Sequence, residues 1–289
     1  MDLHNIDNYL LPTDINQLPD WGKGWSWLAG GTWLFSEPQP EIKTLVDIQS
    51  LGWDEIDLID PPNSPYEGGL NNSHQGKLLA IGATCPLIKL LQHSWLPEYT
   101  AVEGFRGAIN ALSASLKVVN MATVGGNICL ALSVGTLAPI MVALDASYEI
   151  WNHKGKSRII AASYFQLASR QTVLQSGELL RRVLIPVENM NWQVDYKRFG
   201  IAASDTALAI VVGAYNSTAK KLRLVIGASV AAPVLLEFEA GLEKNFNYIA
   251  SLKNLDFIED AKASGVYRRE ITQILIKQCL NQLTVSSEQ

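Results

Sequence analysis

The stretch Ala122-Thr123-Val124-Gly125-Gly126-Asn127-Ile128 carries the strongest single signal in this chain. Two adjacent glycines allow positive φ angles and leave no Cβ in the path of a ligand. Consecutive backbone N–H groups can then converge on a phosphate, with Thr123 and Asn127 adding side-chain donors. Because the stretch contains no Lys or Arg, neutral donors would have to hold that anion. The pattern predicts a loop that binds a dinucleotide pyrophosphate, and an ordinary tight turn is the alternative.

A second glycine pair occurs earlier, in Leu28-Ala29-Gly30-Gly31-Thr32, directly after a predicted strand. It also places a threonine beside the glycines and contains no basic residue. Either loop alone is as easily explained by a turn at the end of a strand. The two loops together favour a shared site for a pyrophosphate.

Short strands and helices alternate around these loops, as expected for an α/β region. The predicted strands are 26–29, 45–48, 56–59 and 78–81, and the predicted helices are 86–93 and 98–116. Prolines, glycines and asparagines between 60 and 76 predict a long surface loop. Further on, the chain predicts a hairpin from 147–151 and 157–161, followed by a strand at 179–185.

The pattern changes after the polar segment 187–191, where we expect a domain boundary. A first domain would cover residues 1–190 and a second would cover 191–289. The second contains a predicted hairpin of 206–215 and 222–230 and predicted helices at 234–244 and 267–283. The expected fold is therefore α+β: an α/β first domain followed by an antiparallel sheet with helices.

Composition limits the classes of function. The chain has 289 residues, a formal net charge of −5 and 48% hydrophobic residues, so it has material for a sizeable core and no basic field for nucleic acid. Its three cysteines lie far apart, and its four histidines show no metal-ligand spacing. No apolar run reaches the ~18 residues of a membrane span. The N-terminus has no signal-peptide pattern, so we expect a cytoplasmic protein without a metal site.

The two glycine motifs occur in the order and at about the separation typical of one family. The chain resembles the FAD-binding medium subunit of the molybdenum hydroxylases, the xanthine dehydrogenase and carbon monoxide dehydrogenase group. Its motifs match that family's A-G-G-T and A-T-V-G-G-N patterns. Weaker matches extend over nearly the whole chain, including 45–48, 81–84, 138–139, 143–146, 176–180, 185–186, 196–197, 226–227, Pro233 and 264–269.

The resemblance implies an FAD-binding domain of the vanillyl-alcohol oxidase type, called PCMH, with two α/β subdomains. A small domain of the carbon monoxide dehydrogenase flavoprotein C-terminal type would follow it. It also implies which residues hold FAD. One side of the cofactor would meet Ala29, Gly30, Gly31, Thr32 and Leu34, and the other would meet Ala122, Thr123, Gly125, Gly126 and Asn127. Leu180 and Lys197 would lie close to the isoalloxazine.

The chain departs from the family pattern at several positions. Family members usually carry an Asp where Thr136 stands, and that Asp reaches ribityl or ribose hydroxyls; Thr136 is neutral and shorter. They usually have Arg where this chain has Val119, and a small or acidic residue where it has Trp33. Family members often carry arginines after the pair that corresponds to Tyr196-Lys197, where this chain has Ile201-Ala202-Ala203. They often carry another after the proline that corresponds to Pro233, where this chain has Val234-Leu235. Each lost buried hydrogen bond costs about 0.5–1.5 kcal/mol, which weakens FAD binding without abolishing it.

The family implies an oxidoreductase within a hetero-oligomer. A large molybdenum–pterin subunit would oxidise the substrate, and a small iron–sulfur subunit with 2Fe-2S clusters would pass electrons to FAD on this chain, which would reduce NAD, a quinone or oxygen. No side chain here need act as acid or base, because the flavin does the chemistry. The alternative is a non-catalytic, flavoprotein-like scaffold in which FAD binding is weakened or lost. A third interpretation is a flavin reductase of the same fold that acts on a UDP-sugar, for which the sequence shows no catalytic motif.

Overall fold

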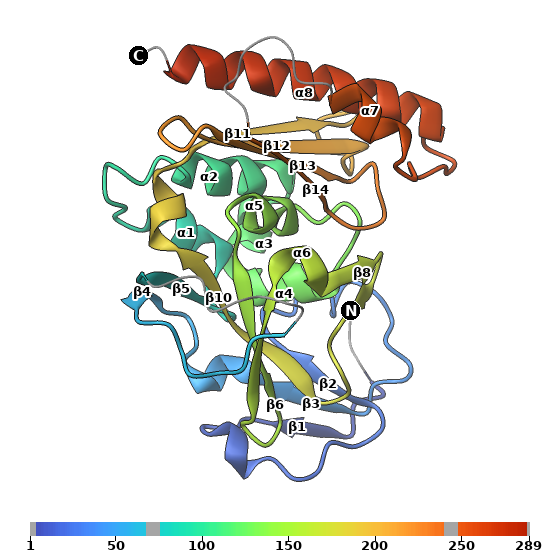
Figure 1. Ribbon diagram of the computed structural model, residues 1–289. Helices are drawn as coiled ribbons and strands as arrows, with labels where there is room; N and C mark the ends of the chain where they lie inside the picture. Colours follow the sequence, from blue (N-terminus) through green and yellow to red (C-terminus); the bar gives the residue numbers. More distant parts are fainter. Residues whose placement is uncertain (1–3, 68–75, 240–247, 288–289) are drawn as a thin grey trace.

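The computed structural model describes residues 4–67, 76–239 and 248–287. It contains a three-stranded sheet of order β1-β3-β2, a five-stranded sheet of order β4-β5-β10-β6-β7 and a four-stranded sheet of order β11-β12-β13-β14, with a small hairpin of β8 and β9. These sheets are stacked from one end of the molecule to the other, and helices fill the space between the second and third (Figure 1).

The three-stranded sheet is parallel and ends where the first glycine motif begins. Its strands are β1 (Asn8–Leu10), β2 (Trp25–Leu28) and β3 (Thr44–Asp47). Asp47 then caps the short 3-10 helix Ile48–Leu51 by accepting from the Gln49 N–H. The sheet therefore fixes the position at which the chain leaves β2 and enters Ala29-Gly30-Gly31.

The five-stranded sheet forms the middle of the molecule. Its strands are β4 (Ile56–Ile59), β5 (Leu78–Gly82), β6 (Ser147–Asn152), β7 (Ser157–Ala161) and β10 (Glu178–Pro186), all paired antiparallel. Every residue of β5 is buried, as expected for a central strand covered on both faces. The strands predicted at 56–59, 78–81, 147–151, 157–161 and 179–185 are confirmed within one or two residues. The expected loop at 60–76 lies partly outside the described residues.

Short helices follow the strands and carry the second motif. They are α1 (Leu87–Gln92), α2 (Val102–Ala111), α3 (Leu116–Met121), α4 (Val124–Leu130), α5 (Leu137–Ala143) and α6 (Ala162–Phe165). The single helix predicted over 98–116 is wrong in its extent. Ser113 adopts φ 52°, which ends α2, and Ser115 then caps a new helix by accepting from the Val118 N–H.

The four-stranded sheet is antiparallel and consists of β11 (Gln193–Phe199), β12 (Ala209–Asn216), β13 (Lys221–Gly227) and β14 (Val234–Glu239). The helix predicted over 234–244 is wrong, because Val234–Glu239 pairs with β13 as an edge strand. Glu237 and Glu239 are exposed on either side of the half-buried Phe238, which is the period of a strand. Residues 240–244 lie outside the described part of the chain.

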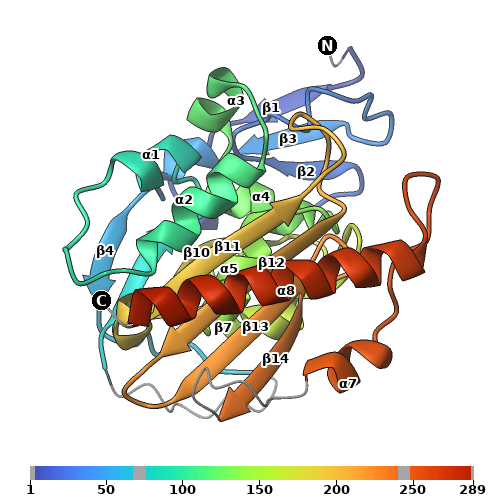
Figure 2. The same cartoon turned by 90° about the horizontal axis from the view of Figure 1, so that it is seen from above.

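Helices cover both faces of this sheet. α8 (Gly265–Ser287) lies across its outer face, with α7 (Tyr248–Lys253) nearby (Figure 2). The helix predicted over 267–283 is thus confirmed. On the inner face, α2 packs on β11 and α5 packs on β12 and β13. Within the described residues, no helix is long and apolar enough to cross a membrane.

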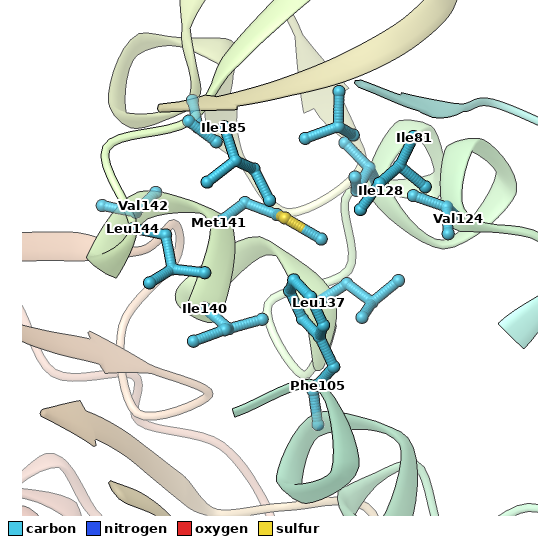
Figure 3. Close-up of a cluster of buried hydrophobic side chains, with 14 of the residues drawn as sticks. Ile81, Phe105, Val124, Ile128, Leu137, Ile140, Met141, Val142, Leu144 and Ile185 are labelled. Carbon is cyan, nitrogen blue, oxygen red and sulfur yellow. The ribbon is translucent and has the colours of Figure 1, made fainter. Parts of the chain in front are cut away.

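One hydrophobic cluster joins the two halves of the chain. It gathers α5 side chains, including Leu137, Ile140 and Met141, with Phe105 of α2 and Ile128 of α4 (Figure 3). The same cluster includes buried residues of the third sheet, namely Ile210, Val212, Ala214 and Val225. A second cluster lies between the third sheet and α8. The boundary expected after residue 190 stays a prediction, and it falls inside the 3-10 helix Val187–Asn191.

Candidate cofactor site

A cavity of about 550 Å³ lies between the end of β2, helices α3 and α4, strand β10 and the segment before β12. This volume is within the range of about 300–1,000 Å³ typical of ligand sites. Every residue predicted to bind the cofactor except Lys197 lines it: Ala29, Gly30, Gly31, Thr32, Leu34, Ala122, Thr123, Gly125, Gly126, Asn127, Thr136 and Leu180. The two motifs, far apart in the sequence, thus meet at one site.

The first motif presents its backbone to this cavity. Gly31 has φ 67°, a left-handed conformation that glycine adopts easily. Gln49 fixes the start of the loop by donating to the Ala29 carbonyl at 2.7 Å, and the Phe35 N–H closes its end on the Gly31 carbonyl at 2.9 Å. Within the described residues, none of the consecutive backbone N–H groups from Gly30 to Leu34 donates a hydrogen bond. These N–H groups are free to donate hydrogen bonds to an anion.

The second motif is built differently from the expectation. Gly125 and Gly126 lie in the first turn of α4, and neither has a positive φ. The Val124 and Gly125 N–H groups donate to the Cys85 and Ala83 carbonyls at 2.9 and 2.8 Å. Thr123 caps the helix by accepting from the Gly126 N–H at 3.0 Å. The expected converging N–H groups are therefore already paired in this motif.

Two of the glycines allow the backbone segments around the cavity to interlock. A Cβ on Gly30 would collide with the carbonyl oxygen of Met121, the last residue of α3. A Cβ on Gly125 would come within 2.7 Å of the Ala83 carbonyl oxygen after β5. The glycines thus let the first motif, α3, α4 and β5 approach at backbone distance. By contrast, a Cβ on Gly126 would meet only the Thr123 hydroxyl, at 2.9 Å.

One buried polar group of the cavity lacks a partner. Thr136 is 2% exposed, and its hydroxyl oxygen makes no hydrogen bond among the described residues. Its carbonyl accepts from the Tyr196 hydroxyl at 2.9 Å, which fixes its backbone. The Asn127 side chain accepts from the Leu137 N–H at 3.3 Å and so joins α4 to α5. An unpaired buried hydroxyl costs about 1–3 kcal/mol, so a ligand that bonds Thr136 recovers that cost.

Lys197 lies outside the set of residues that line the cavity. It sits on β11, and its Nζ is 3.0 Å from the Asp195 carboxylate. Thr206 and Ala207, which lie just before β12, line the cavity instead. Val119, where the family usually has Arg, is buried in the main hydrophobic cluster.

The cavity wall carries little charge. Among the described residues that line the cavity, Glu178 alone is charged, and the Arg158 guanidinium donates to its carboxylate at 2.9 and 2.7 Å. Burial opposes ionisation of Glu178, but the hydrogen bonds from Arg158 and the Gln175 N–H outweigh it, and the pKa of the carboxyl lies below its ordinary value. Cys129 also lines the cavity, and burial raises its pKa to about 12, so its thiol is neutral at physiological pH.

Several residues that line the cavity were not predicted from the sequence. Trp27 reaches the cavity from β2, and its indole N–H donates to the Glu178 carbonyl at 3.0 Å. Trp27 lies two residues before Ala29 on the strand that leads into the first motif, and this position could have predicted that it lines the cavity. Cys129, Thr206 and Ala207 carried no pattern of their own, because only the packing of α4 and β11–β12 brings them to the site.

The comparisons with known proteins agree with this geometry. The family model described as "FAD binding domain in molybdopterin dehydrogenase" matches residues 7–188. The chain is 37% identical over 135 residues to xanthine dehydrogenase 2 of Arabidopsis thaliana, which is 45% of this chain and 10% of that protein. It is 26% identical over 176 residues to the nicotine 6-hydroxylase medium subunit of Paenarthrobacter nicotinovorans, which is 57% of this chain and 61% of the relative. The matches thus span less than two thirds of these relatives.

The fold similarity extends over almost the whole chain. A chain of reconstituted CO dehydrogenase from Oligotropha carboxidovorans superposes with a TM-score of 0.76 at 20% identity, and the match covers 99% of both chains. A chain of quinoline 2-oxidoreductase from Pseudomonas putida 86 gives a TM-score of 0.72 at 19% identity, covering 98% and 99%. The expected fold is therefore confirmed. By the family match over most of its length, this chain belongs to the FAD-binding domains of molybdopterin dehydrogenases.

Proposed function

We propose that this chain is the FAD-carrying electron-transfer subunit of a molybdenum-containing oxidoreductase. The observation that carries the proposal is the run of open backbone N–H groups from Gly30 to Leu34, all of them residues that line a cavity with little charge. Such a wall suits a dinucleotide whose flat rings pack against apolar side chains and whose pyrophosphate needs several neutral donors.

The residues present fit FAD. The first motif would donate its N–H groups to the pyrophosphate, and Thr32 would add a hydroxyl. Gly126, which has nothing but the Thr123 hydroxyl near its missing side chain, would leave room for the phosphates against α4. Thr136 would give its unpaired hydroxyl to a sugar or ribityl hydroxyl. When bound, FAD supplies the redox chemistry, and the chain supplies binding, orientation and the exclusion of water.

The electron path rests on the family relationship. Electrons would arrive from 2Fe-2S clusters of a small partner subunit, after substrate oxidation at a molybdenum–pterin centre in a large one. They would leave for NAD, a quinone or oxygen. Relatives are named as the medium subunit of nicotine 6-hydroxylase and subunit beta of caffeine dehydrogenase, which accords with a multi-subunit enzyme.

The test is the visible spectrum of the purified chain, alone and co-expressed with its candidate partners, followed by identification of the flavin released on heating. We expect a flavin spectrum with about one FAD per chain. Reduction of the co-purified iron–sulfur subunit should then bleach the flavin band. A colourless protein that also fails to bind added FAD would refute the proposal and favour the scaffold interpretation.

A further inference from the structure

The described residues that line the cavity include no Lys or Arg, yet one arginine packs against a lining side chain. Arg170 places its guanidinium carbon 5.0 Å from the centroid of the Trp33 ring, and Trp33 lines the cavity. Glu37 lies 3.7 Å from the same guanidinium. A cation over the face of an indole is attracted by the negative face of the ring. The backbone N–H of Trp33 also belongs to the open donor run, so this cation is stacked on a side chain of the segment that carries the open donors.

Arg170 comes from a segment that lies far from Trp33 in the sequence and outside the cavity lining. It forms the turn between β8 (Gln166–Ala168) and β9 (Gln171–Thr172), with φ 60°. Its backbone N–H donates to the Ala131 carbonyl at 2.7 Å, at the end of α4. The buried side chain of Gln166 donates to the same carbonyl at 3.0 Å. The hairpin is therefore fastened to the helix that carries the second motif.

The Trp33–Arg170 contact thus joins the two motifs across the cavity edge. Trp33 belongs to the first motif, and Arg170 is fixed to the end of α4, which follows the second. Trp33 is half-buried, and the Arg170 side chain is 55% exposed, so the contact lies where the cavity meets solvent.

Resting on the proposed function, we infer that Arg170 and Trp33 form a latch that closes over the bound dinucleotide and supplies the counter-charge to its pyrophosphate. The latch is defined by these two side chains. Retention of FAD would then depend on its phosphates as well as on its isoalloxazine ring. Flavins that lack phosphate would gain nothing from Arg170.

The test compares Arg170→Gln with Arg106→Gln in the full-length chain. Arg106 is a matched control, since it is half-exposed, pairs with Glu103 on α2 and does not line the cavity. Affinities and dissociation rates of FAD and of riboflavin are measured by fluorescence at two salt concentrations. For Arg170→Gln we expect FAD to dissociate roughly three- to tenfold faster, with a smaller salt dependence, and riboflavin binding to change less than about twofold.

Two further variants separate charge from shape. Arg170→Lys should recover part of the FAD affinity, because it keeps the charge and loses the planar stacking. Trp33→Leu combined with Arg170→Gln should cost less than the sum of the single changes, because the two side chains act as one unit.

The inference is overturned if Arg170→Gln retains FAD as Arg106→Gln does, or if it weakens FAD and riboflavin equally. The second result would mean that the hairpin had moved and that no counter-charge was lost. Failure of the wild-type chain to bind either flavin would instead refute the proposed function.

Discussion

The four glycines of the two motifs differ in what surrounds them. Gly30 and Gly125 allow backbone segments to touch, whereas Gly31 provides a left-handed turn. Gly126 alone of the four has only one near neighbour for an added Cβ, the capping hydroxyl of Thr123. A substitution at Gly126 therefore tests the cavity with the least damage to the surrounding fold.

We expect Gly126→Val to abolish flavin retention, because its side chain would enter the space given to the phosphates. Disturbing the Thr123 cap should lower the free energy of unfolding by about 1 kcal/mol. Flavin content after gel filtration measures retention, and urea unfolding measures the free energy of unfolding. Gly76→Val is the control, since its nearest atom would be the Glu188 carboxylate at 3.4 Å. A fully flavinylated Gly126→Val protein would contradict the placement of FAD against α4.

The unpaired hydroxyl of Thr136 gives a second prediction. Thr136→Asp should tighten FAD, because a carboxylate accepts more strongly from cofactor hydroxyls, and it should destabilise the empty protein by burying a charge. Thr136→Val should weaken FAD by up to about tenfold and leave the empty protein at least as stable, since it removes an unpaired polar atom. Isothermal titration and urea unfolding give both quantities. An FAD dissociation constant unchanged in both variants would mean that Thr136 does not touch the cofactor.

At the scale of elements, β10 and β7 are tied together by ion pairs beside the cavity. Arg158 of β7 contacts Glu178 of β10 at 2.7 Å and Glu67 at 2.6 Å. The Trp27 indole donates to the backbone of the same Glu178, so one residue connects the first sheet to the second. This connection holds the strand that ends at the first motif against the strand that carries Leu180.

The ion pair predicts a pH dependence of stability. The pKa of Glu178 is lower in the folded chain than its ordinary value, so the pair stabilises the fold above that ordinary value, and this contribution disappears as the pH falls through the folded-state pKa. Glu178→Gln should therefore lower the free energy of unfolding by about 1 kcal/mol at pH 7 and by less at pH 3. Urea unfolding at both pH values checks this, with the exposed Glu98→Gln as control. An equal loss at both pH values would show that packing, not charge, is involved.

At the scale of the whole molecule, the main hydrophobic cluster crosses the expected boundary at residue 190. Ile210, Val212 and Val225 are fully buried in it, although they follow the family-model match at 7–188. Without the third sheet, the faces of α2 and α5 that contact β11, β12 and β13 would be exposed to water. The FAD-binding region therefore depends on the second region for its core.

We expect residues 1–190 expressed alone to be unstable or molten, with secondary structure but without a cooperative unfolding transition. The full chain should unfold in a single transition that coincides by fluorescence and circular dichroism. Adding residues 191–289 in trans is the control for reconstitution. A fragment 1–190 that unfolds cooperatively and binds FAD would instead establish it as an independent domain.

The sequence by itself determined most of the elements and the family, and every residue that it predicted for the cofactor except Lys197 lines the cavity. It could do so because strand and helix periods are local, and because the two glycine motifs recur in a fixed order. It failed at 234–239, where a short apolar run is ambiguous until β13 offers hydrogen bonds to it.

Only the tertiary structure decided what each motif does. Among the described residues, the N–H groups of Gly30–Leu34 are open. Those of Val124 and Gly125 are paired, because the carbonyls of Cys85 and Ala83, about forty residues earlier in the chain, lie against α4. The approach of Arg170 to Trp33 likewise depends on a hairpin fastened to Ala131. Such pairings join residues distant in the chain, so no local pattern encodes them, and they determine where a phosphate can be bound.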